Sequence, residues 1–249
     1  MRKSKFLIGA VLGVTASLAF AGTASAAVLN QTFSSVASKT KQDRKVRGAV
    51  GEFKTDVDTT YDAVFSPAGA QTVLSFDRAF KFNPGNLDEC NPASIVAQGA
   101  AGARAICGDA MVGQGSATLR STPTGAQTLP GVVSAFNGVP SGGRPVILLH
   151  TDVAGITTKP ILTGTLNGTV LTVSIPPSPT VITHFDTTIN RVKVRNANKK
   201  KGKPAQYYVM AKCNDGNWEH SETTTFTDGS TKSASFSQKC TKKKSKKKK

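Results

Sequence analysis

The sequence contains few of the residues that carry out chemistry. Its 249 residues include three histidines, one tryptophan and 15 acidic residues. No Gly-x-Ser-x-Gly motif presents a nucleophile, and no closely spaced pair of cysteines or histidines offers a zinc site. The sequence therefore holds no motif that fixes a reaction, a metal or a cofactor. We expect a non-enzymatic protein without a cofactor.

Long apolar runs are also scarce, and the one that exists is N-terminal. A cationic start at residues 2–5 precedes a 16-residue apolar run, residues 6–21, and small residues follow at positions 24–26. This order is typical of a secretory signal peptide, here cleaved after Ala26. A membrane-spanning helix needs about 20 apolar residues, so an uncleaved anchor is the less favoured alternative. We expect residues 1–26 to be removed and the remainder to be secreted and extracellular, without a transmembrane segment.

Only four cysteines are present. In an exported chain they favour two disulfides, because the compartment is oxidising. Four cysteines allow three connectivities, and we predict pairing of the nearest in sequence, Cys90 with Cys107 and Cys213 with Cys240. A zinc site is the alternative, but these spacings do not match known zinc motifs.

Short segments of alternating apolar and polar residues, separated by glycine and proline, predict a β-rich protein. The expected strands span residues 72–82, 116–120, 132–136, 145–150, 161–175, 181–195 and 207–213. Residues 27–70 are more loosely patterned and predict one or two short strands. The expected fold is mainly β, an antiparallel β-sandwich or barrel-like domain spanning residues 27–240.

One helix is expected, over residues 91–108. Asn91 is a typical N-cap and Pro92 suits the first helical position. Gly99 and Gly102 weaken the helix by about 1 kcal/mol each relative to alanine. Its docking should therefore depend on the Cys90–Cys107 disulfide across its ends.

Two tight hairpins are also expected. Asn167-Gly168 is a dipeptide that favours a hairpin turn inside residues 161–175. At the C-terminal end, a three-residue loop at 227–229 with Gly229 in the left-handed conformation places Phe226, Ala234 and Phe236 on one face. A two-residue turn would separate the two phenylalanines.

The formal charge of +17 is concentrated in three stretches. Outside residues 2–5, 191–203 and 242–249, 15 basic residues balance the 15 acidic ones. The cations expected to bind polyanions are Arg191, Lys193, Arg195, Lys199, Lys200, Lys201, Lys203, Lys242, Lys243, Lys244, Lys246, Lys247, Lys248 and Lys249. Residues 241–249 should form a disordered polylysine tail.

These cations suggest retention at the cell envelope, on an anionic wall polymer or a membrane surface. A tail that only improves solubility is the plainer interpretation. No recognition helix accompanies the charge, so we expect no sequence-specific binding of nucleic acid.

An alternative function is a secreted hydrolase or a carbohydrate-binding module. His150 and Asp152 would share one strand face, as would His184 and Asp186, and Trp218 could stack on a sugar. Each feature also has an ordinary structural explanation, a polar contact for the histidines and a core position for Trp218. The alternative requires these side chains to meet in one cleft.

The order of features is similar to that of uncharacterised secreted proteins of high-GC Gram-positive bacteria, of the actinobacterial type. It comprises Cys90, a helix and Cys107, then Tyr207 to Cys213, Asp215-Gly216-x-Trp218, Asp228-Gly229 and Cys240. The resemblance implies a secreted protein with this fold and no assigned function.

Overall fold

The computed structural model describes residues 28–61, 67–85, 87–121, 127–157, 159–194 and 205–242. In these ranges eleven strands form one antiparallel sheet, in the order β1-β4-β12-β7-β8-β9-β10-β11-β5-β14-β15. They are β1 (Val28–Ala37), β4 (Phe53–Tyr61), β5 (Gly69–Ser75), β7 (Met111–Ser121), β8 (Thr128–Ser141), β9 (Arg144–Val153), β10 (Ile161–Asn167), β11 (Val170–Ser174), β12 (Thr180–Ile189), β14 (Asn217–Phe226) and β15 (Thr231–Lys239). The expected mainly β, antiparallel, barrel-like fold is confirmed.

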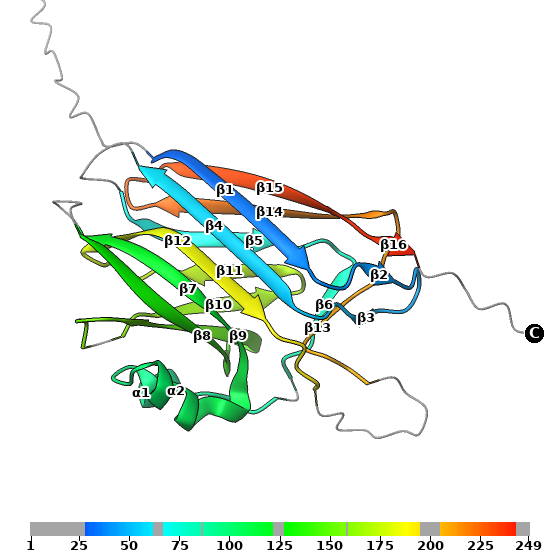
Figure 1. Ribbon diagram of the computed structural model, residues 1–249, viewed down its shortest axis with the longest axis horizontal. Coiled ribbons are helices and arrows are strands. Elements are labelled where there is room, and N and C mark those ends of the chain that lie inside the picture. The colour runs from blue at the N-terminus through cyan, green and yellow to red at the C-terminus, as the bar shows by residue number, and fades with distance from the viewer. Residues whose placement is uncertain are drawn as a thin grey trace, which may run out of the picture.

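The sheet curls until its first and last strands lie beside each other, with β1, β4, β12 and β7 in front of β14, β5, β11 and β10 (Figure 1). Because an odd number of strands alternate in direction, β1 and β15 run the same way. No backbone ladder joins these two strands in the described ranges. Instead, the Gln238 side chain receives a hydrogen bond from the Ala37 N–H at 2.8 Å and donates one to the Ala37 carbonyl at 2.9 Å. The barrel is therefore nearly closed, with a seam between β1 and β15.

The main core fills the space inside the sheet. Side chains alternate along each strand, and the inward set of β14 runs from Trp218 to Phe226. One end of this interior is closed by an aromatic cluster in which Phe53, Phe76 and Phe80 contact one another or Trp218. Small strands gather at the same end in Figure 1, namely β2 (Lys41–Gln42), β3 (Gly48–Ala49), β6 (Phe80–Phe82), β13 (Val209–Ala211) and β16 (Thr241–Lys242).

A helical segment covers the outer face of β8 and β9 (Figure 1). It consists of α1 (Pro92–Ile95), α2 (Ala100–Cys107) and a 3-10 turn (Gly108–Ala110). Ile95, Ala103 and the Cys90–Cys107 disulfide pack there against Phe136 and Leu148, forming a second small core. The middles of β8 and β9 are therefore buried on both faces, which explains the continuous apolar run at residues 146–149.

The single helix expected over residues 91–108 is instead two helices. The Asn91 cap is confirmed, since its Oδ1 accepts the Ala93 N–H at 3.0 Å. The break follows because two carbonyls bond outside the helix: that of Val96 accepts the Lys159 N–H at 2.8 Å, and that of Gln98 lies 3.0 Å from His150 Nε2.

Two other segments differ from expectation. Residues 27–70 were expected to hold one or two short strands, but they supply β1 and β4, of ten and nine residues. Residues 72–82 were expected to be one strand, but β5 ends at Ser75 and β6 belongs to a separate sheet. Asp77 separates them, since its side chain accepts the Ala79 N–H at 2.7 Å and forms a turn.

Both expected hairpins are present. Gly229 has a positive φ, and the Phe226 N–H bonds to the Ser230 carbonyl across the three-residue loop. The hairpin at residues 161–175 turns at Gly168 and Thr169, one residue later than expected, because Asn167 pairs with Val170. The Cys213–Cys240 disulfide is confirmed beside the C-terminal hairpin. Thr241 and Lys242, expected to be disordered, form β16 and pair with β2.

Candidate functional site

A largely apolar cavity lies inside the curled sheet. Its volume, counted as the space open to the centre of a water molecule, is about 110 Å³. Val57 and Phe185 line it from β4 and β12, and Leu74, Leu166 and Leu171 line it from β5, β10 and β11. The cavity therefore separates the two layers of the sheet, in a fold wide enough to enclose a small molecule.

The two ends of the cavity differ in exposure. At one end Phe53 and Phe76 are buried in the aromatic cluster. At the other end Thr59, Tyr61 and Ile182 line the cavity and are only half-buried. The lining side chains named at the Tyr61 end are therefore less buried than Phe53 and Phe76.

A group of polar side chains lies on the cavity wall where β1 meets β14. The Thr224 hydroxyl receives a hydrogen bond from Gln31 Nε2 at 3.0 Å, lies 2.7 Å from the Thr72 hydroxyl, and donates to Glu222 Oε1. Gln31, Thr72 and Thr224 line the cavity, and Glu222 lies behind Thr224. We call these four residues the interior polar group.

Two acceptor atoms of this group have no hydrogen-bond partner among the described residues. They are Gln31 Oε1 and Glu222 Oε2, on side chains that are 7% and 0% exposed. Burial raises the pKa of Glu222 to about 7, although hydrogen bonds from Thr224 and Gln31 act in the opposite direction. A buried carboxyl group without a cation is costly, so this group calls for a structural or functional explanation.

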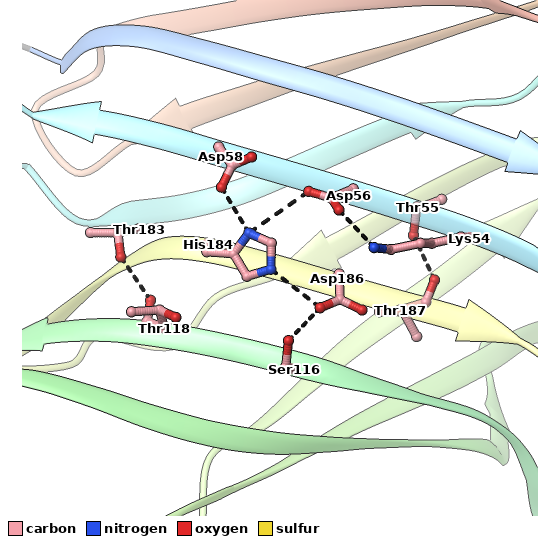
Figure 2. A network of polar contacts seen from close by, with 10 residues as sticks. All are labelled: Lys54, Thr55, Asp56, Asp58, Ser116, Thr118, Thr183, His184, Asp186 and Thr187. Atoms are coloured by element: carbon pink, nitrogen blue, oxygen red, sulfur yellow. Dashed lines mark hydrogen bonds and ion pairs between the residues drawn. The ribbon is translucent and has the colours of Figure 1, made fainter.

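A second polar cluster lies on the outer face of β4 and β12 (Figure 2). His184 Nδ1 lies 2.7 Å from Asp58 and 3.7 Å from Asp56, and its Nε2 lies 3.2 Å from Asp186. Lys54 pairs with Asp56 at 3.0 Å, and Ser116 bonds to Asp186. Burial alone would lower the pKa of His184, but the surrounding carboxylates outweigh it and raise the pKa.

This outer cluster has the composition of a cation site. Asp56, Asp58 and His184 offer three ligand atoms within 4.8 Å of one another. However, a protonated His184 and Lys54 already provide positive charge to the three carboxylates. The contacts are those of an ion-pair network on a partly exposed surface, in which two cationic groups face three carboxylates.

We expect His184→Gln to reduce stability more at low pH than at high pH. The raised pKa means that the stabilisation is complete below the ordinary histidine value of 6.5 and is lost as pH rises through the raised value. At about pH 5.5 the loss should be up to about 1 kcal/mol, the usual range for partly exposed ion pairs. Urea unfolding at about pH 5.5 and about pH 9 measures it. An equal loss at both values would contradict the assignment.

The predicted pair His150 and Asp152 shares one face of β9, beneath the helical segment. His150 is fully buried, and burial lowers its pKa. Asp152 accepts the Ala100 N–H at 2.7 Å and pairs with Lys159 at 2.8 Å, and these two contacts lower its pKa. The pair therefore attaches the helices to the sheet.

The residues of the alternative site do not meet. β9 and β12, which carry the two histidine pairs, are separated by β7 and β8 in the sheet. His184 lies on the outer face, and Trp218 is fully buried with its Nε1 donating to the Lys212 carbonyl at 2.8 Å. The single cleft that the alternative function requires is therefore not formed by these residues.

Three of the predicted polyanion-binding cations lie in the described residues. Arg191 and Lys193 are exposed, and Val192 and Val194 point to the core as expected. The Arg191 guanidinium lies 4.6 Å from the centre of the Tyr207 ring, and the backbones of Lys193 and Tyr207 form an isolated antiparallel β-bridge. Lys242 lies in β16. The other eleven lie outside the described residues: Arg195, Lys199, Lys200, Lys201, Lys203, Lys243, Lys244, Lys246, Lys247, Lys248 and Lys249.

Comparison with known proteins identifies no relative: no family model, curated protein or solved structure matches the chain. The resemblance to secreted actinobacterial proteins therefore stays a prediction. Within the described ranges, neither α1 nor α2 has the length and apolar character needed to cross a membrane. The two disulfides fit an oxidising, non-cytoplasmic compartment.

Sequence reasoning missed the interior polar group. The signal available was the alternation of β14, in which Glu222 and Thr224 share the parity of Trp218 and Phe226. Gln31 had no comparable signal, because residues 27–70 were expected to be loosely patterned.

Proposed function

We propose that the protein is a secreted, non-enzymatic binding protein that holds an apolar small molecule inside its sheet. The observation that carries this proposal is the cavity itself, which is lined mainly by aliphatic and aromatic side chains and a few polar ones. Such pockets are the usual sites for small ligands. The absence of a shared cleft for His150, Asp152, His184 and Trp218 disfavours the hydrolase alternative.

The size of the cavity limits the ligand. A volume of about 110 Å³ for molecular centres corresponds to roughly 7 to 11 water molecules. Counting about one non-hydrogen atom for each water, the ligand should contain about ten non-hydrogen atoms. Naphthalene, with its carbon rings and no polar group, is a suitable test compound.

We expect naphthalene to bind the purified protein, as measured by isothermal titration calorimetry. Val57→Trp should fill the cavity and weaken binding by about tenfold or more, because packed interiors do not absorb extra volume. Thr60→Trp is the matched control, since it adds the same side chain to the exposed outer face of β4. Circular dichroism checks that both variants fold. Failure of the wild-type protein to bind, or equal binding by Val57→Trp, would overturn the proposal.

The location of the protein forms a second part of the proposal: retention at the cell envelope, on an anionic wall polymer or membrane surface. The support is the signal-like N-terminus and the 14 cations of residues 191–203 and 242–249. Replacing the seven lysines of residues 242–249 with glutamine keeps the chain length and should release the protein from cells. Retention that survives both this change and a salt wash contradicts the idea.

A further inference from the structure

We propose that the ligand carries a hydrogen-bond donor, a hydroxyl or ammonium group, that Gln31 Oε1 on the cavity wall receives it, and that the nearby Glu222 carboxylate, which does not line the cavity, acts through its charge. This inference rests on the proposed function, because it names the chemistry of a molecule held in the same cavity. Its starting point is that Gln31 lines the cavity, is 7% exposed and has an unpartnered oxygen.

The hydrogen-bond inventory decides which atoms remain available. A threonine hydroxyl has one proton, and Thr224 donates its proton to Glu222 Oε1. Gln31 and Thr72 must therefore donate their hydrogen bonds to the Thr224 oxygen. The Gln31 amide accordingly turns its nitrogen towards Thr224 and its oxygen away. The atoms left over, Gln31 Oε1 and Glu222 Oε2, are both acceptors when the carboxyl is ionised. Because Gln31 lines the cavity, a ligand that satisfies its Oε1 must donate.

Charge supports the same choice. No cation is among the groups that influence the pKa of Glu222. A buried carboxylate favours an incoming positive or neutral donor and opposes a second carboxylate.

Three ligands of equal chain length test the inference: decanol, decylamine and decanoate, measured by calorimetry at about pH 8, where the amine is charged and the acid ionised. We expect decanol or decylamine, or both, to bind at least about tenfold more tightly than decanoate. If Glu222→Gln weakens decylamine more than decanol, the donor is ammonium; if Gln31→Leu weakens decanol and Glu222→Gln does not, it is hydroxyl. Equal binding of all three ligands overturns the inference.

Gln31→Leu should weaken the donor ligand by about tenfold more than it weakens naphthalene, because it removes the acceptor and keeps a side chain of similar size. Gln114→Leu, the same change at an exposed position of β7, is the matched control and should affect neither ligand. Unchanged binding of the donor ligand by Gln31→Leu rejects the inference while naphthalene binding still supports the proposed function. Failure of the wild-type protein to bind naphthalene rejects the proposed function itself.

Discussion

Trp218→Ala is expected to lower the free energy of unfolding by about 3 to 5 kcal/mol, the range for removing a large aromatic side chain from a core. Trp218 is fully buried, packs against Phe80 with ring centroids 5.0 Å apart, and donates to the Lys212 carbonyl. It lies at the closed end of the interior, beside the Cys213–Cys240 disulfide. Substitution with alanine leaves a cavity and an unpaired carbonyl.

Urea unfolding of the wild type and two variants measures this effect. Trp218→Phe keeps an aromatic ring and loses the indole N–H, so it should cost less than Trp218→Ala. Val132→Ala removes an apolar side chain that is 47% exposed and should change stability by less than about 0.5 kcal/mol. A loss for Trp218→Ala as small as that for Val132→Ala would mean that Trp218 does not support the core.

Features set by local chemistry could be predicted from the sequence. The disulfide pairs followed from their spacing, and the Asn91 cap followed from a residue that bonds to its own neighbours. The loop around Gly229 followed from the requirement that Phe226 and Phe236 share a face. In each case the deciding contact lies within a few tens of residues along the chain.

Features set by distant contacts could not be predicted. β1 contains polar residues on its inward face, Gln31 and Ser35, so its alternation does not resemble that of a buried strand. The break between α1 and α2 depends on His150 and Lys159, which both lie more than 50 residues along the chain from the carbonyls they bond. The seam depends on the strand count of the whole sheet, which no single segment encodes.

The candidate site shows the same division. The residue types of His150, Asp152 and His184 suggested chemistry. The sheet instead places His150 and Asp152 beneath the helical segment and His184 in a separate, partly exposed cluster. Glu222 was not predicted as a site residue, because a lone glutamate in an alternating strand usually faces the solvent. Glu222 lies an even number of residues from Trp218 on β14, so it faces the interior. There no cation offsets the effect of burial, and its pKa is raised.

Glu222→Gln is expected to change how stability depends on pH. The pKa of Glu222 is raised from the ordinary 4.5 to about 7, so the folded state retains a proton that the unfolded state has released. Stability from this residue is therefore complete below about pH 4.5 and falls as pH rises to about 7, by roughly 3 kcal/mol in all. Glutamine cannot ionise, so the variant should lack this decline.

Urea unfolding of the wild type and Glu222→Gln at about pH 4.5, 6 and 8 tests the expectation. As pH rises across this range, the wild type should lose roughly 3 kcal/mol of stability relative to the variant. Glu219→Gln, at an exposed position of the same strand, is the control and should show no comparable shift. Parallel curves for the wild type and Glu222→Gln would contradict a buried, proton-retaining Glu222.

The same experiment connects stability to ligand chemistry. An ammonium group bound in the cavity near Glu222 would favour the ionised carboxylate and lower its pKa in the folded state. Saturating decylamine should therefore stabilise the wild type at about pH 8 more than at about pH 4.5, while decanol should not show that pH dependence. In Glu222→Gln the difference between the two ligands should disappear. If decylamine stabilises the wild type and the variant equally at every pH, its ammonium group does not interact with the charge of Glu222.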